Sequence, residues 1–304
     1  MAQLQAVRST LQPEGNGYTQ LTTYFDTHAK VAWGYMHAEP RPCFTPTLLH
    51  ELLHWCHAVA SQIDDPTQPD VNYMVTASSH EGVFNYGGDL NRFAEMIAAG
   101  DRDRLTQYAK ACIEPLYLNA VNLNRPGLKS IALVQGDALG GGFECALSGN
   151  VLIAERGTKL GFPEVLFNLF PGMGALSLLG RRVGYQKAEQ MILSGRLFLA
   201  EELHGMGVVD ILAEPGKGEA AVYEFIRREA RSRNGALALR NARNEIQPIV
   251  YSELMRVTEI WVDAALRLEP KDLRMMERLV SRQTGKSDTQ VESKSTVVSQ
   301  ALSA

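Results

Sequence analysis

The sequence feature that most constrains the fold is an alternation of short apolar runs with longer helical patterns. The apolar runs predict strands at 18–25, 31–37, 71–77, 131–135 and 151–154. Helical patterns begin after Thr45, with Pro46 at the first helical position, near 89 and 101, over 173–203, and from 220 onward. Strands that alternate with helices are typical of a largely parallel sheet covered by helices. We therefore predict an α/β fold with a helical C-terminal region.

The same pattern divides the chain into four predicted segments. Residues 1–16 and 286–304 are polar and show no strong period, which predicts flexible ends. Residues 17–212 form the predicted core and residues 213–285 the C-terminal helical region. With 304 residues, 45% of them hydrophobic, the chain can bury a substantial core.

Composition argues against several classes of protein. A net charge of −4 lacks the basic excess of a nucleic-acid-binding protein. The longest apolar stretch, 138–154, is interrupted by Glu144, Asn150 and glycines, so we expect no membrane insertion. There is no apolar secretory signal, and the four cysteines form no C-x-x-C pair, so we expect reduced thiols in the cytoplasm. The four are Cys43, Cys56, Cys112 and Cys145. The spacing G-x-G-x-x-G is not met after Gly140 or Gly172, and we expect neither cofactor nor metal.

A glycine loop that places a carboxylate is the first candidate for chemistry. In QGDALGGGFECAL, an apolar strand leads through Gly140, Gly141 and Gly142 into a helix. Bare glycines allow a ligand to approach, and the first N–H groups of a helix have no internal partner. Glu144 follows Gly141 by three residues, a spacing that puts both on one helix face. The segment predicts a carboxylate beside an oxyanion donor; a tight turn with a first-turn acid is the alternative.

A second glycine loop, HEGVFNYGGDL, also runs from a strand to a helix. The N–H of Gly88 is a candidate second donor, and Asp89 stands near the helix start. Two donors from neighbouring loops could bind one oxyanion. An Asp-capped turn without further function is the alternative.

A second carboxylate occurs in an apolar setting. In KLGFPEVLFNLFPGMG, Glu164 is flanked by Phe162, Val165 and other apolar residues. Little water around a carboxyl raises its pKa, which suits a general acid or base near neutral pH. A turn glutamate without catalytic function is the alternative.

Taken in order, FNYGGDL, GDALGGGFECAL and GFPEVLFNLFPGMGA resemble the crotonase (enoyl-CoA hydratase/isomerase) superfamily. The resemblance covers about residues 30–285. It implies that Gly88 and Gly141 are the oxyanion donors and that Glu144 and Glu164 form the acid/base pair. It further implies a spiral of ββα units, with C-terminal helices that form a homotrimer or a dimer of trimers. An aromatic residue of these helices lines the acyl pocket in the family, and Trp261 is the matching candidate; packing in a helix core is the alternative.

Two stretches, YFDTHAKVAWGYMHAEPRPCF and IEPLYLNAVNLNRPGLKSIALVQGDALGGGFE, look like the diffusible signal factor synthases within this superfamily. That group implies dehydration of a 3-hydroxyacyl group on acyl carrier protein to a cis-2-enoyl thioester. The thioester is then hydrolysed to a free fatty-acid signal, and a regulatory sensor protein is a further candidate partner. RPGLKSIAL stands where CoA enzymes carry K-P-x-I-A, which leaves CoA or carrier-protein substrates open. An ordinary enoyl-CoA hydratase or isomerase is the alternative.

A rival motif occurs at His50-Glu51-Leu52-Leu53-His54, which reads H-E-x-x-H. On a helix its two histidines share one face, as in a zinc peptidase. The extended metzincin form fails because His57 stands where glycine is needed. The sequence therefore keeps a zinc peptidase only as a remote alternative.

Overall fold

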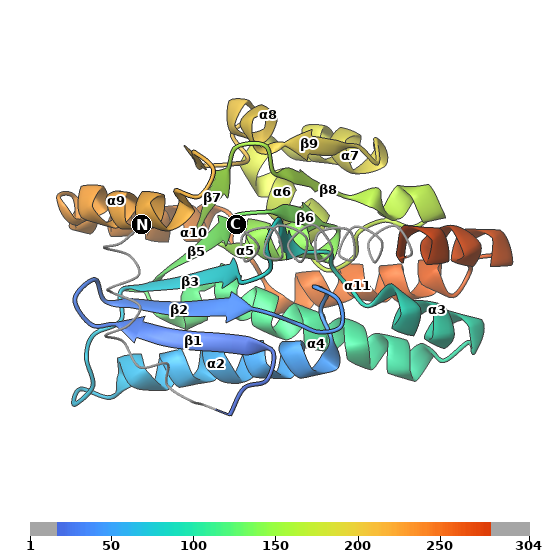
Figure 1. Cartoon of the computed structure of the whole chain (residues 1–304), viewed down its shortest axis with the longest axis horizontal. Helices are drawn as coiled ribbons and strands as arrows, with labels where there is room; N and C mark the ends of the chain where they lie inside the picture. Colours follow the sequence, from blue (N-terminus) through green and yellow to red (C-terminus); the bar gives the residue numbers. More distant parts are fainter. Residues whose placement is uncertain (1–16, 281–304) are drawn as a thin grey trace, which may run out of the picture.

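Six strands form the central sheet of the computed structural model, which describes residues 17–280 (Figure 1). Their order is β1-β2-β3-β5-β7-β10; β1 pairs with β2 antiparallel, and the other neighbours are parallel. The strands are β1 (Leu21–Asp26), β2 (Val31–Met36), β3 (Tyr73–Ser78), β5 (Lys129–Val134), β7 (Val151–Glu155) and β10 (Ile211–Ala213). The two segments predicted to be flexible ends, 1–16 and 286–304, lie outside the described residues.

The inner strands are buried throughout because helices cover both faces of the sheet. Side chains alternate along a strand, so Met74 and Ala132 face one core, whereas Val75 and Ile131 face the other. In Figure 1, α2 and α4 lie along one side of the sheet and α9 lies on the other. The helices concerned are α2 (Pro46–Asp64), α4 (Arg102–Ala120), α5 (Gly141–Ser148) and α9 (Gly218–Ala230). The predicted α/β class with largely parallel pairing is confirmed.

A second sheet of four short strands lies beside the first and was not predicted from the sequence. Its order is β4-β6-β8-β9, with β8 and β9 antiparallel. The strands are β4 (Val83–Asn85), β6 (Asp137–Leu139), β8 (Lys159–Gly161) and β9 (Leu197–Leu199). Each long strand from β3 onward is followed by one of these short strands and then by helix, which is the repeated ββα unit that the family resemblance implies. The helix after β4 is α3 (Leu90–Ala98).

The prediction of one helical stretch over 173–203 is wrong, because the structure does not form a continuous helix there. The structure divides it into α6 (Ala175–Val183), α7 (Tyr185–Leu193), strand β9 and α8 (Ala200–Gly205). Gly184 and Gly195 stand at the breaks, with φ of +84° and +60°. An α-helix requires negative φ, so these two residues end the helices that precede them.

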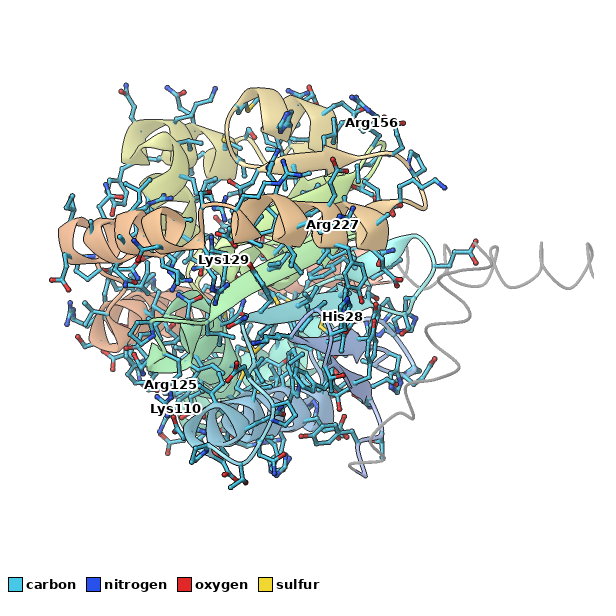
Figure 2. All side chains as sticks on the ribbon, turned by 90° about the vertical axis from the view of Figure 1, so that its left-hand side faces the viewer. His28, Lys110, Arg125, Lys129, Arg156 and Arg227 are labelled. Carbon is cyan, nitrogen blue, oxygen red and sulfur yellow. The ribbon has the colours of Figure 1, made fainter. Side chains whose placement is uncertain are left out.

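The C-terminal helices close the fold. α9 crosses the sheet, where the ammonium of Lys129 pairs with the carboxylate of Glu229; Figure 2 shows Lys129 beneath this helix. α10 (Arg233–Ile246) follows, and α11 (Tyr251–Ala265) packs on α4. Within residues 17–280, no helix is long and apolar enough to cross a membrane. The division of the chain at residue 212 stays a prediction.

Candidate active site

The two glycine loops meet at the N-terminus of α5. A Cβ atom built on Gly141 would lie 3.4 Å from the nitrogen of Gly88, and one built on Gly87 would lie 2.7 Å from the nitrogen of Gly141. Among residues 17–280, neither the Gly88 N–H nor the Gly141 N–H donates a hydrogen bond. The structure therefore brings together the two donors that the sequence singles out.

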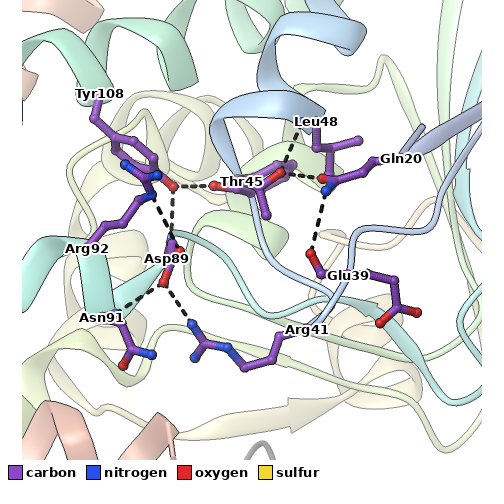
Figure 3. A network of polar contacts seen from close by, with 10 residues as sticks. Gln20, Glu39, Arg41, Thr45, Leu48, Asp89, Asn91, Arg92 and Tyr108 are labelled. Atoms are coloured by element: carbon purple, nitrogen blue, oxygen red, sulfur yellow. Dashed lines mark hydrogen bonds and ion pairs between the residues drawn. The ribbon is translucent and has the colours of Figure 1, made fainter. Parts of the chain in front are cut away.

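A polar network holds the loop that carries Gly88 (Figure 3). The carboxylate of Asp89 accepts a hydrogen bond from the guanidinium of Arg41 at 2.7 Å. The backbone N–H of Asp89 donates to the hydroxyl of Tyr108 at 3.0 Å. The N–H of Phe44 donates to the carbonyl of Gly87 at 2.8 Å. Asp89 also caps α3 by accepting from the N–H of Asn91, so the capped turn and the donor loop are one structure. These contacts fix the direction of the Gly88 N–H before any ligand binds.

Gly140, Gly141 and Gly142 lack side chains, and the space that this leaves is occupied partly by other protein atoms. A Cβ on Gly142 would lie 2.0 Å from the carbonyl oxygen of Asn85, and one on Gly140 would lie 2.4 Å from Oε1 of Glu164. Gly140 also has a φ of +54°. The close approach of a ligand that the bare glycines predict stays a prediction at Gly140, which lines the cavity beside Glu164; Gly142 packs against Asn85. Only the donor role proposed for Gly141 depends on an exposed N–H.

Glu144 is buried, with 1% of its surface exposed, and is held by two backbone donors. Its Oε1 accepts hydrogen bonds from the N–H groups of Met173 and Ala175, each at 2.9 Å. Ala175 begins α6, so its N–H has no partner inside that helix. Burial raises the pKa of Glu144 to about 7, and the two N–H donors oppose part of that rise.

Glu164 stands on a single turn of 3-10 helix, Pro163–Phe167, with its carboxylate against Gly140. Its Oε2 is buried and has no hydrogen-bond partner within the described residues 17–280. Burial, and then the charge of Glu144, hold the pKa of Glu164 well above its ordinary value. The direction is the one that its apolar neighbours predict.

Both carboxyls line one cavity of about 430 Å³. Gly88, Gly140 and Gly141 line it as well, and most of its remaining wall is apolar. Trp261 also lines it, while packing closely on Gly172 and lying with its ring centre 5.0 Å from that of Phe93. Trp261 is therefore both a cavity wall and a packing residue. The apolar wall comes from α2, α4, α11 and the turn around 163–173 and includes Leu49, Leu52, Trp55, Leu116, Phe167, Leu169, Met173 and Met276.

The H-E-x-x-H motif lies elsewhere and its glutamate has a structural role. Glu51 is buried and accepts from the backbone N–H groups of Thr19 and Gln20, at 2.7 and 2.8 Å. His50 is exposed, and His54 contacts Tyr18. Within the described part of the chain, no three His, Cys, Asp or Glu side chains are grouped so that they could hold a metal ion. The structure gives the zinc alternative no support.

Sequence reasoning missed the groups that position Glu144. The sequence pattern predicts a helical stretch from residue 173 onward, but it does not indicate that the N–H groups of Met173 and Ala175 bind the carboxylate of Glu144. The available signal was the helix start itself, because its first donors always need an acceptor. What the sequence lacked was the information that α5 and α6 pack together.

Comparison with known proteins gives a family and a fold. The profile of the enoyl-CoA hydratase/isomerase family matches residues 39–239. The chain is 35% identical over 147 residues to a peroxisomal fatty acid beta-oxidation multifunctional protein, AIM1, of Arabidopsis thaliana, which is 48% of this chain and 19% of that protein. It is 29% identical over 154 residues to a fatty acid oxidation complex subunit alpha of Pseudomonas savastanoi, which is 51% of this chain and 21% of that subunit. The match thus spans about a fifth of the length of these relatives.

Solved structures match over most of the chain. A putative enoyl-CoA hydratase from Streptomyces avermitilis is 22% identical with a TM-score of 0.67, over 88% of this chain and 91% of that one. An enoyl-CoA hydratase from Bacillus halodurans is 18% identical with a TM-score of 0.71, over 86% and 100%. DspI from Pseudomonas aeruginosa is 26% identical with a TM-score of 0.62, over 77% and 84%. At these identities the first two show the fold alone.

Proposed function

Because this chain belongs to the enoyl-CoA hydratase/isomerase family, we propose that it moves protons on an acyl thioester with Glu144 and Glu164. The N–H groups of Gly88 and Gly141 bind the thioester oxygen. One observation carries this proposal: two free N–H donors and two buried carboxyls border a single apolar cavity. An acyl chain fits the apolar wall, and the polar groups meet the reacting end.

The electrostatics of the carboxyl pair suit acid–base chemistry near neutral pH. Burial raises the pKa of Glu144 to about 7, and burial and then the charge of Glu144 hold the pKa of Glu164 well above its ordinary value. Two neighbouring carboxyls in an apolar cavity do not both ionise readily, so in the proposed mechanism the pair carries one proton. One carboxylate then serves as the base and one carboxyl as the acid, which is what adding or removing water requires.

Dehydration of a 3-hydroxyacyl thioester uses all four groups. The ionised carboxylate removes a proton from Cα, and the electron pair moves onto the thioester oxygen, which Gly88 and Gly141 hold. The enolate then collapses to form the Cα–Cβ double bond, and the bond from Cβ to the hydroxyl oxygen breaks. The neutral carboxyl donates its proton to that oxygen, which leaves as water. Each oxyanion donor lowers the barrier by roughly 2.7–4 kcal/mol.

The finer proposal is that the substrate is a 3-hydroxyacyl group on acyl carrier protein, that the product is cis-2-enoyl, and that hydrolysis follows. In hydrolysis a carboxylate takes a proton from water as its oxygen attacks the carbonyl. The same two N–H groups hold the tetrahedral oxyanion. As it collapses, the bond from carbon to sulfur breaks, and the carboxyl returns the proton that it took from water to the leaving sulfur. The free fatty acid would leave the cytoplasm as a signal. The resemblance of residues 113–144 to diffusible signal factor synthases supports this choice.

An ordinary enoyl-CoA hydratase or isomerase is the second candidate. The likeness to fatty acid oxidation proteins favours it, because their names place them in fatty acid breakdown. The same four groups would add water to an enoyl thioester, since the catalyst serves both directions.

Product analysis tests the proposal and separates the two candidates. Purified protein is incubated with 3-hydroxyacyl-carrier protein and, separately, with 3-hydroxyacyl-CoA, and the products are identified by mass spectrometry. Release of a cis-2-enoic acid from the carrier protein supports the finer proposal, and a trans-enoyl thioester alone supports the second candidate. Absence of any product from either substrate contradicts both. Glu51→Gln is the matched control for the two catalytic glutamates, because Glu51 is buried and hydrogen-bonded but lies outside the cavity.

We further propose that the chain forms a trimer, or a dimer of trimers, through its C-terminal helices. α10 has no buried residue, and Leu239 and Ile246 on it are 74% and 79% exposed. Exposed apolar side chains of this kind are typical of a surface that another subunit covers. Sedimentation of the wild type and of Leu239→Asp measures the mass; an unchanged monomer for both contradicts the proposal.

A further inference from the structure

A polar group without a partner lies at the far end of the active-site cavity from the oxyanion donors. One face of α5 lines the cavity with Gly141, Glu144, Cys145 and Ser148. Gly141 and Ser148 are the first and last residues of this helix, so they lie about 10 Å apart along its axis. At Ser148 the cavity wall is completed by Asn119 of α4.

Hydrogen bonds fix the orientation of the Asn119 amide. The hydroxyl of Ser148 donates to the carbonyl of Cys145 at 2.6 Å, so its proton is not available to Asn119. The amide nitrogen Nδ2 of Asn119 must therefore be the group that donates to Ser148, at 2.7 Å. This leaves Oδ1 of Asn119 buried, with no partner among residues 17–280. The residue is 6% exposed and lines the cavity. Oδ1 itself has almost no exposed surface, so a donor inside the cavity reaches it once the wall beside it shifts.

A second polar side chain from another element lies near the same end. Thr76 of β3 lines the cavity and is 5% exposed. In the sheet it stands opposite Ala132, whose Cβ would be 3.2 Å from a Cβ on Gly149, the residue that follows Ser148. The walls between this end and the carboxyls are mainly apolar. Polar groups from three elements thus converge where an apolar chain would end.

We propose that Asn119 and Thr76 form a hydrogen-bonding subsite for an O–H donor at the distal end of the bound acyl chain. The subsite rests on the proposed function, because it presumes that the thioester oxygen lies at Gly88 and Gly141. A chain of single bonds advances about 1.2 Å per bond, so about eight or nine bonds span the distance from the oxyanion donors. An unsubstituted chain of that length leaves Oδ1 of Asn119 buried and unpaired, which weakens its binding.

The O–H donor has two possible sources. A hydroxyl on the acyl chain itself makes the enzyme selective for hydroxylated acyl groups. A bound water molecule at Asn119 instead limits the length of unsubstituted chains, because a longer chain must displace it. Both use the same acceptor, and a binding series distinguishes them.

Calorimetry measures binding without turnover if the ligands cannot react. The ligands are acyl-CoA analogues in which a methylene group replaces the thioester sulfur. Octanoyl, decanoyl and dodecanoyl analogues, each with and without a terminal hydroxyl, are titrated into the wild type and three variants. Asn119→Leu removes the acceptor and keeps the volume of the side chain similar. Thr76→Val removes the nearby hydroxyl, and it replaces Asn119→Leu in the test if that variant does not fold. Ile113→Val is the matched control, since Ile113 is buried on α4 but does not line the cavity.

We expect one hydroxylated analogue to bind wild type about tenfold more tightly than its unsubstituted counterpart, and Asn119→Leu to abolish the difference. If water is the source, the hydroxyl gives no gain, but affinity falls beyond one chain length and Asn119→Leu removes that limit. Affinities that are unchanged in Asn119→Leu and Thr76→Val for every analogue overturn the subsite. Failure of every analogue to bind the wild type, whether it is carried by CoA or by acyl carrier protein, overturns the proposed function and the subsite with it.

Discussion

The two carboxyls of the cavity differ in how the fold holds them. Glu144 is fixed by two N–H donors, one of them at the start of a helix, and is almost fully buried. Glu164 stands on a single helical turn and rests against Gly140, and its Oε2 has no hydrogen-bond partner among residues 17–280. Hydrogen bonds from two N–H groups of another segment favour the ionised form of Glu144, whereas only the backbone N–H of Glu164 itself favours ionisation of Glu164.

This difference explains how one apolar cavity can hold an acid and a base together. Burial alone would raise the pKa of both carboxyls and leave the site without a base. The donors from the α6 start return Glu144 to a pKa of about 7, and its charge then disfavours ionisation of Glu164. The following predictions test this asymmetry, beginning with the largest effect.

Replacement of either carboxyl by its amide should abolish most turnover. Glu144→Gln and Glu164→Gln each remove a proton-transfer group while keeping the size of the side chain and one acceptor oxygen. We expect kcat to fall by about a hundredfold to ten-thousandfold in each variant, with folding retained. Single-turnover assays with a 3-hydroxyacyl thioester measure the loss, and Glu51→Gln should stay within a fewfold of wild type. Normal turnover in either site variant would remove that residue from the acid/base pair.

The stability of the fold should record the raised pKa of Glu144. The folded state holds this proton up to about pH 7, whereas the unfolded chain releases it near 4.5. Between those values the folded state binds more protons, so stability falls as pH rises, by about 3 kcal/mol in total. Glu144→Gln cannot ionise and should therefore unfold at higher denaturant than wild type at pH 8, with a much smaller difference at pH 4. Equal differences at both pH values would mean that burial does not perturb this carboxyl.

Moving Glu164 without altering its chemistry should have an intermediate effect. In Gly140→Ala the new Cβ would lie 2.4 Å from Oε1 of Glu164, so the carboxylate must shift. We expect kcat to fall about tenfold to a hundredfold, and the free energy of unfolding to fall by about 1–2 kcal/mol because φ is positive there. Gly205→Ala is the control, since a Cβ there meets nothing within 4 Å. Unchanged kcat in Gly140→Ala would show that the position of Glu164 is not critical.

The sequence was sufficient for the main sheet and insufficient for the second. Strands such as β3 and β5 are long runs of buried residues bounded by turns, and a run of that length predicts a strand. β4, β6, β8 and β9 have three residues each, too few to show a period of two. Their pairing depends on contacts between distant loops, which no local pattern encodes.

For the site, local motifs indicated which groups to examine, and tertiary packing supplied the rest. Gly141 and Glu144 share a helix start, so their spacing alone predicts proximity. That Met173 donates to Glu144, or that Asn119 meets Ser148, depends on how separate helices pack. The catalytic roles of the four groups stay predictions until the variants are measured.

The smallest expected effect concerns the coupling between the two carboxyls. The charge of Glu144 is the second cause, after burial, of the raised pKa of Glu164. Glu144→Gln removes that charge, so the pKa of Glu164 should fall but remain above its ordinary value, because burial persists. Carbon NMR of protein labelled at the glutamate carboxyls follows the titration, and Glu51→Gln should leave the Glu164 resonance unchanged. If the pKa of Glu164 is the same in Glu144→Gln as in wild type, the two carboxyls act independently. In that case burial alone, and not the charge of Glu144, holds the proton on Glu164.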